Sequence, residues 1–79
     1  MPPRAKPHRL PESIAFGKQL RKLREAKGWT LEEAGEAARM NELQVGHVER
    51  GATDPRLSTI VKLARAYGLT PSELLRTLR

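Results

Sequence analysis

The sequence of 79 residues is long enough for one small domain, and its lack of cysteine excludes disulfides and thiolate zinc sites as sources of stability. No apolar run approaches the roughly 20 residues needed to cross a bilayer, and the N-terminus lacks the apolar stretch of a signal peptide, so we expect a cytoplasmic protein. The formal net charge of +6 favours a nucleic acid as partner, although many small soluble proteins are basic for other reasons.

The charge is distributed unevenly along the chain. The segment 29–51 carries Arg39 and Arg50 against five glutamates, whereas the segments on both sides of it are basic. Any interpretation of this segment as a nucleic-acid reader therefore has to accommodate an excess of negative charge.

Residues 1–11, MPPRAKPHRLP, are rich in proline and show no apolar period. This composition predicts a flexible basic arm over residues 1–11, followed by one folded domain over residues 12–79. An arm of this kind could follow a minor groove of DNA or be inert. Its cations are Arg4, Lys6 and Arg9.

Two helices with a short connection are predicted after the arm. The first is indicated by apolar or small residues at the spacing of one helical face, namely Ile14, Gly17, Leu20 and Leu23. Gly28 ends this helix. Thr30 then caps a second helix, with Glu33 at the capping-box position.

A third helix is predicted between Asn41 and Gly51. Asn41 is its N-cap, with Gln44 at the capping-box position, and Gly51 stands where a left-handed C-terminal cap belongs. Val45 and Val48 are expected to face the core.

Two further helices complete the domain. The fourth follows a loop with Asp54 and Pro55 and is predicted from apolar residues at core spacing: Leu57, Ile60, Leu63, Ala64 and Tyr67. The fifth starts at the clearest signal in the chain, with Thr70 as N-cap, Pro71 at the first helical position and Glu73 in the capping box. No segment shows the alternation of a strand, so the sequence predicts a compact all-α domain of five helices.

The run from Leu20 to Leu75 resembles the lambda-repressor-like helix-turn-helix family of the Xre/Cro type. The matching stretches are LRKLREAKGWT, LEEAGEAARMNELQVGHVERG and DPRLSTIVKLARAYGLTPSELL. Gly35 supplies the small residue that the first helix of the motif requires, and Val45 supplies the β-branched residue of the second. The resemblance implies a DNA-binding domain whose recognition helix runs from about Asn41 to Arg50.

In this family the start and middle of the recognition helix contact bases. The candidates implied here are Glu42, Leu43, Gln44, Gly46 and His47. Gln44 could pair with adenine unless its side chain is used in the capping box, and a solvated helix surface is the alternative for all of them. Neither His47 nor His8 has further ligands at a spacing suited to zinc, and no cofactor is expected.

The family also contacts DNA phosphates through helix N-termini and the loop after the recognition helix. The candidates implied here are Lys18, Arg21, Lys22, Arg50, Thr53, Arg56 and Ser58. The alternative for Arg50 is compensation of the helix dipole. The resemblance also implies a structural ion pair between Arg24 and Glu49, which ties the first helix to the third.

Three positions depart from the family pattern. Leu31 replaces a glutamine that usually contacts DNA, and Arg39 replaces the glycine of the turn, where it must accept a left-handed conformation or reshape the turn. Gly46 removes a potential base reader. We therefore expect binding to depend more on phosphate contacts, on DNA shape and on two copies of the chain.

The function implied is that of a sequence-specific transcriptional regulator, without enzymatic activity, which binds a palindromic operator as a homodimer. The leucines expected at the dimer interface, or alternatively in the core, are Leu69, Leu74, Leu75 and Leu78. Glu32 and Glu36 could touch an RNA polymerase sigma subunit, as in some relatives, or simply be solvated.

The size resembles that of restriction-modification controller proteins, and antitoxins and phage-type repressors are similar in size. The alternative function is a protein-interaction module or an antitoxin that keeps the fold with weak or no direct DNA readout. An enzyme is disfavoured because the sequence has no nucleophile–base pair, metal cluster or phosphate loop.

Overall fold

The computed structural model describes residues 10–76 and 78, and this part of the chain forms helices and no strand. The elements in chain order are α1 (Pro11–Lys27), α2 (Leu31–Ala38), α3 (Glu42–Glu49), α4 (Leu57–Ala66) and α5 (Pro71–Leu74). The predicted all-α domain of five helices is confirmed. Leu10 is the N-cap of α1, so the helix starts slightly before the expected boundary at residue 12. The arm residues Arg4, Lys6 and Arg9, together with His8, lie outside the described residues.

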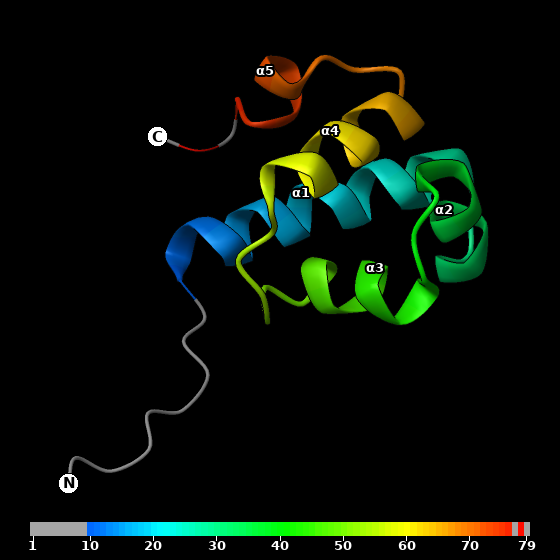
Figure 1. Cartoon of the computed structure of the whole chain (residues 1–79), viewed down its shortest axis with the longest axis horizontal. Coiled ribbons are helices and arrows are strands. Elements are labelled where there is room, and N and C mark those ends of the chain that lie inside the picture. Colours follow the sequence, from blue (N-terminus) through cyan, green and yellow to red (C-terminus); the bar gives the residue numbers. More distant parts are fainter. Residues whose placement is uncertain (1–9, 77, 79) are drawn as a thin grey trace, which may run out of the picture.

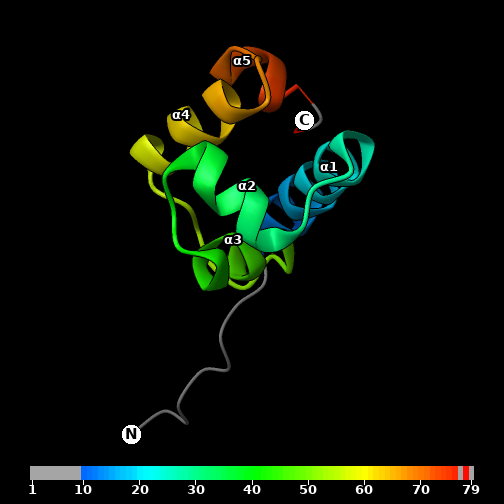
Figure 2. The same cartoon turned by 90° about the vertical axis from the view of Figure 1, so that its right-hand side faces the viewer.

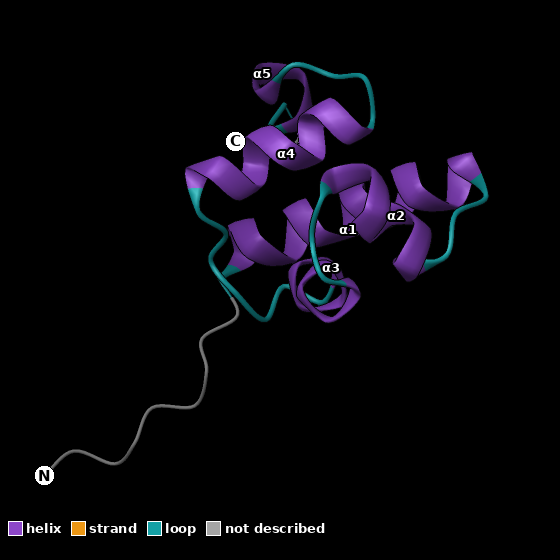
Figure 3. Ribbon diagram, turned by 45° about the vertical axis from the view of Figure 1, so that its right-hand side comes forward, coloured by secondary structure: helices purple, strands orange, loops and turns teal. Residues whose placement is uncertain are grey.

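The helices form a compact group in which α3 and α5 lie on opposite sides, with α1, α2 and α4 between them (Figures 1 and 2). Figure 3 shows that the connections between the helices are short. Direct packing joins α2 to α3, α1 to α3, α2 to α4 and α4 to α5. This arrangement leaves one side of α3 free at the surface.

The core contains side chains from all five helices, with Ala38 as the contribution of α2. Its largest fully buried members include Phe16 and Leu20 from α1, Leu63 from α4 and Leu74 from α5, none more than 2% exposed. Val48 carries the core into α3 and is 3% exposed. Burial of such a side chain contributes about 1.5 to 3 kcal/mol, so this cluster is the main source of stability in a domain without disulfides.

The capping boxes predicted for α2 and α5 are both formed. In α2, Thr30 Oγ1 accepts a hydrogen bond from the Glu33 backbone N–H at 3.1 Å, and the Thr30 N–H donates to Glu33 Oε1 at 2.9 Å. Thr70 and Glu73 repeat this exchange at the start of α5, where the hydrogen bonds from Thr70 lower the pKa of Glu73. Each box satisfies backbone donors that a helix start otherwise leaves unpaired.

Two leucines lie in places that differ from the expectation. Leu57, predicted in the core, is 73% exposed, because buried Thr59 takes the inward position in the first turn of α4 and Leu57 stands two residues before it, on the other side of the helix. Leu74, predicted at a dimer interface, is 0% exposed and cannot contact a partner. Leu69, Leu75 and Leu78 are partly buried and pack against the core.

Candidate nucleic-acid interface

The turn between α2 and α3 sets the position of the exposed helix. Arg39 adopts the left-handed conformation with φ 57° and ψ 48°, which costs a non-glycine residue about 1 kcal/mol. The Met40 N–H donates to the Gly35 carbonyl oxygen at 2.8 Å. A Cβ on Gly35 would lie 2.6 Å from the Met40 carbonyl oxygen, so the turn requires glycine there. Of the two outcomes open for Arg39, the structure shows the strained backbone rather than a reshaped turn.

An ion pair holds α3 on α1. Arg24 Nε donates to Glu49 Oε2 at 2.8 Å, and Arg24 Nη2 donates to Glu49 Oε1 at 3.1 Å. The third guanidinium nitrogen, Nη1, donates to the Trp29 carbonyl oxygen at 2.9 Å, and the hydrogen bond to Glu49 raises the pKa of Arg24. The side chains of Arg24 and Glu49 are only 16% and 6% exposed. Both groups therefore have a structural role and are poorly accessible to a ligand.

A close backbone approach accompanies this pair. A Cβ on Gly17 of α1 would lie 2.6 Å from the Val48 carbonyl oxygen and even closer to that of Glu49. Glycine is therefore needed at this position for α1 and α3 to pack as they do. The sequence shows Gly17 only as a small residue on the apolar face of α1.

The outward side of α3 carries the predicted base readers. Glu42, Leu43, Gln44 and His47 are exposed, whereas Val45 and Val48 are buried as predicted. Leu43 is 69% exposed, so its side chain is accessible to an external partner.

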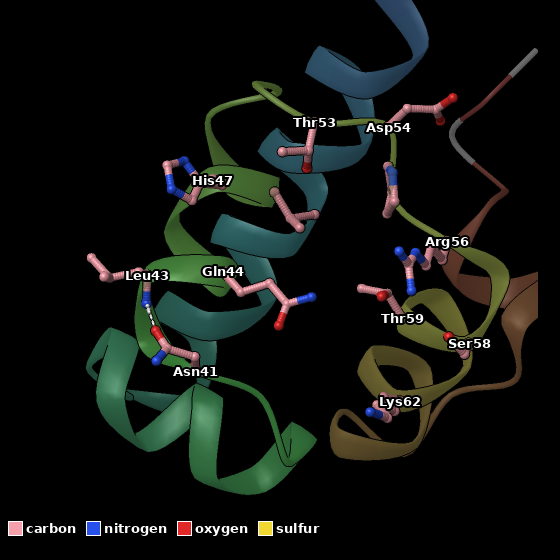
Figure 4. A pocket seen from close by; sticks show the side chains of 12 residues that line it. Asn41, Leu43, Gln44, His47, Thr53, Asp54, Arg56, Ser58, Thr59 and Lys62 are labelled. Atoms are coloured by element: carbon pink, nitrogen blue, oxygen red, sulfur yellow. Dashed lines mark hydrogen bonds between the residues drawn. The ribbon is translucent and has the colours of Figure 1, made fainter.

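The predicted capping box of α3 is not formed. Asn41 Oδ1 accepts from the Leu43 backbone N–H at 2.7 Å, and Gln44 takes no part in the cap. Gln44 instead extends across the gap toward α4 (Figure 4). The side chain of Gln44 is therefore available for an external partner.

Gly46 is buried, so its assignment as a base reader is wrong. The Arg50 guanidinium lies across it, because a Cβ on Gly46 would be 3.1 Å from Arg50 Nη1 and 3.8 Å from Leu31 Cδ1. Arg50 Nη2 and His47 Nδ1 are 3.1 Å apart. Since arginine only donates, His47 Nδ1 accepts, and the ring then carries its proton on Nε2.

A wide hollow separates α3 from the start of α4. This α3–α4 hollow has a volume of about 680 Å³ and is lined by Asn41, Leu43, Gln44, His47, Val48, Thr53, Asp54, Pro55, Arg56, Ser58, Thr59 and Lys62 (Figure 4). It brings together base-reader candidates from α3 with phosphate candidates from the following loop and α4. Lys62 was missed by sequence reasoning, although it stands four residues after Ser58 and hence on the same side of α4.

A second hollow lies where α1, α2 and α3 meet. This α1–α3 hollow has a volume of about 270 Å³ and is lined by Arg21, Arg24, Leu31, Gly46, Glu49 and Arg50. Arg21 also forms an exposed ion pair with Glu25 at 3.3 Å. Lys18 and Lys22 are exposed on α1 but line neither of these two hollows.

Other kinds of site lack support among the described residues. In that part of the chain, no three side chains of His, Cys, Asp or Glu gather as they would around a metal ion. No helix in residues 10–76 is both long and apolar enough to span a membrane.

Residues 15–79 match the family described as "Helix-turn-helix domain". The chain is 39% identical over 57 residues to the HTH-type transcriptional regulator DdrOP3 of Deinococcus deserti, which covers 72% of this chain and 44% of that protein. It is 32% identical over 62 residues to the HTH-type transcriptional regulator PuuR of Escherichia coli, which covers 78% of this chain and 34% of that protein. The chain therefore spans less than half the length of these two relatives.

Solved structures of similar fold include regulators of comparable size. The restriction-modification controller protein C.AhdI from Aeromonas hydrophila has a TM-score of 0.78 at 38% identity, covering 82% of this chain and 98% of that chain. The clp gene regulator ClgR from C. glutamicum has a TM-score of 0.78 at 28% identity, covering 91% of this chain and 92% of that chain.

Proposed function

Because the chain belongs to the helix-turn-helix domain family, of the lambda-repressor (Xre/Cro) type, we propose that it is a transcriptional regulator that binds double-stranded DNA with α3 in the major groove. The observation that carries this proposal is the presence of cations on two flanks of the exposed helix. Arg56 and Lys62 line the α3–α4 hollow, and Arg21 and Arg50 line the α1–α3 hollow. A helix in the major groove has a phosphate backbone on each side, so cations on both flanks suit this ligand.

The acidic excess of the segment 29–51 does not oppose this proposal, because most of it is engaged or lies elsewhere. Glu33 caps α2, and Glu49 is paired with Arg24. Two further glutamates are on the exposed side of α2, which leaves Glu42 as the glutamate on the outward side of α3. The surface offered to DNA is thus less acidic than the sequence composition suggests.

Base readout would come from three side chains on α3. Gln44 can donate to and accept from adenine, His47 with its proton on Nε2 can donate to a guanine acceptor, and exposed Leu43 can pack on a thymine methyl group. This set is small, so phosphate contacts and two copies of the chain would supply much of the affinity.

We propose that the chain acts as a homodimer through one side of the domain. Because α3 and α5 lie on opposite sides (Figures 1 and 2), a dimer with both α3 helices on one face of DNA has to meet through a surface between them. Leu75 and Leu78 line a small hollow of about 80 Å³ together with Phe16, Pro55 and Ile60, and the polar residues Glu12, Ser13 and Asp54 complete its lining. Leu57, which is exposed at the start of α4 two residues after Pro55, is included with Leu75 and Leu78 in the proposed interface.

The deciding experiment is selection of bound sequences from random duplex DNA by the purified protein. We expect enrichment of a palindromic motif with half-sites about one helical turn apart. A protein-interaction module of the same fold would give no enrichment even at low salt, and binding to its partner would change little with salt because few counterions are released.

A contact with RNA polymerase is a second proposal that rests on α2. Glu32 and Glu36 are four residues apart on one side of this helix, both are exposed, and neither forms an ion pair within the described part of the chain. Charge reversal at Glu36 should abolish activation of a promoter that carries the selected operator while operator binding is kept. Unchanged activation with unchanged binding removes the idea.

A further inference from the structure

A fourth hollow, between the end of α2 and α4, has an unusual lining. This α2–α4 hollow has a volume of about 290 Å³ and is lined by Ala37, Ala38, Arg39, Lys62 and Arg65. Three of its five lining side chains are cations and none is a carboxylate. None of the three cations forms an ion pair with a carboxylate among residues 10–76.

Two unfavourable features coincide at this place. Like charges gathered around one hollow repel each other, and they are usually interspersed with acids on a surface of mixed charge. Arg39 in addition holds a left-handed backbone conformation, which glycine or asparagine would accept at lower cost. Dipole compensation at a helix end accounts for Arg39 and Arg65, but not for Lys62, which stands in the middle of α4.

We propose that Arg39, Lys62 and Arg65 form a binding site for a phosphate group. The two guanidinium groups can each donate a forked pair of hydrogen bonds to phosphate oxygens, and the ammonium group adds a point charge. The other two lining residues, Ala37 and Ala38, have small side chains, which leave room for an anion close to α2. The hollow is large enough for a phosphate that carries a substituent.

Two sources could supply this phosphate. Lys62 lines both the α3–α4 hollow and the α2–α4 hollow, so a DNA strand bound in the first would have a phosphate near the second. In this case the inference rests on the proposed DNA-binding function. A free phosphate compound is the other source, and it would bind whether or not the chain binds DNA.

The test compares Arg65→Gln with Arg76→Gln. Of the hollows described above, Arg65 lines only the α2–α4 hollow. Arg76 is an exposed cation that follows α5 and lines none of them. Each variant loses one positive charge, so effects of net charge cancel in the comparison. Arg39→Asn is a further variant, because asparagine tolerates the left-handed conformation and should keep the fold.

Two probes distinguish the sources. In the first arm, inorganic phosphate and pyrophosphate are titrated into the intact chain, and the side-chain resonances of Arg39 and Arg65 are followed by NMR. In the second arm, the affinity for a random-sequence duplex of about 30 base pairs is measured over a range of salt concentrations, where each lost phosphate contact lowers the slope of log K against log salt by about 0.9.

A saturable shift of the Arg39 resonance that Arg65→Gln removes and Arg76→Gln keeps assigns the site to a free phosphate compound. A lower salt slope in Arg65→Gln alone assigns it to DNA. Equal behaviour of the two variants in both arms overturns the proposal. If the duplex fails to bind the wild-type chain, the proposed DNA-binding function fails, and the titration with phosphate still decides this inference.

Discussion

The guanidinium group of Arg50 lies across Gly46, in the space that any other residue at position 46 would begin to fill. A Cβ there would be 3.1 Å from Nη1 of Arg50, at the far end of a flexible side chain. Gly46 has no side chain that could contact a base. Its missing side chain leaves space for the Arg50 guanidinium on α3, beside His47. The guanidinium group of Arg50 thereby lies at the flank of the proposed reading helix, where a phosphate would lie.

Gly46→Ala should therefore separate stability from DNA binding. Alanine stabilises a helix interior by about 0.5 to 1 kcal/mol relative to glycine, and Arg50 can move aside at little cost. We expect a higher free energy of unfolding in urea and a lower affinity for DNA. The matched control is Gly17→Ala, in which the new Cβ meets backbone rather than a side chain and should destabilise the chain by about 3 kcal/mol. A loss of stability in Gly46→Ala would show that Arg50 is held rigidly.

The second prediction concerns the contribution of the ion pair between Arg24 and Glu49 to the free energy of unfolding. Removal of one partner of a buried pair costs about 3 to 5 kcal/mol, and the partial exposure of Arg24 reduces this to about 2 to 3 kcal/mol. Arg24→Ala and Glu49→Gln should each lower the free energy of unfolding by that amount. The double variant should lose much less than the sum of the two, because each single change leaves the other group buried without its partner. Additive losses in chemical denaturation would contradict a coupled pair.

Tyr67 gives a prediction in alkaline solution. Burial raises the pKa of its phenol from 10.0 to about 12. The folded chain therefore keeps a proton that the unfolded chain releases, so the stability from the neutral phenol is complete below pH 10 and is lost between about pH 10 and 12, by about 2 to 3 kcal/mol. Tyr67→Phe should show a correspondingly smaller loss of stability over this range.

The same substitution should be harmless near neutral pH. The buried Tyr67 hydroxyl has no hydrogen-bond partner among the described residues, and an unpaired buried polar group costs about 1 to 3 kcal/mol. Tyr67→Phe should thus raise the free energy of unfolding at pH 7 or leave it unchanged. A clear loss at pH 7 would indicate that the hydroxyl is hydrogen-bonded in solution.

The features that could be predicted from the sequence are those set by neighbours in the chain. The exchange between Thr30 and Glu33 spans a single turn, so residue types and spacing are sufficient to predict it. Asn41 has the same kind of spacing to Gln44, yet its side chain bonds to the Leu43 N–H and leaves Gln44 free. The side chain of an N-cap residue can accept from the backbone N–H either two or three residues later, and the sequence spacing alone does not determine which bond forms.

The features that could not be predicted depend on contacts between distant segments. Leucine periodicity indicates a helix, but the depth of Leu57 and Leu74 follows from how α4 and α5 meet the rest of the domain. From the sequence, Gly46 is only a position without a side chain. The contact with the Arg50 guanidinium, which covers it, is visible only in the structure. The bounds of α3 agree with the helix predicted between Asn41 and Gly51, while the hollows around it depend on the packed structure.

Leu57 provides the last prediction, which concerns the proposed dimer. Its side chain is 73% exposed, so Leu57→Asp should leave the core intact, and an aspartate in the first turn of α4 is favoured by the helix dipole. We expect this variant to be folded, to sediment as a monomer and to bind a palindromic operator more weakly than the wild type. Leu74→Ala is the contrasting change, because it leaves a cavity in the core and should cost about 2 to 5 kcal/mol of stability. If Leu57→Asp still sediments as a dimer, the interface lies on another side of the domain.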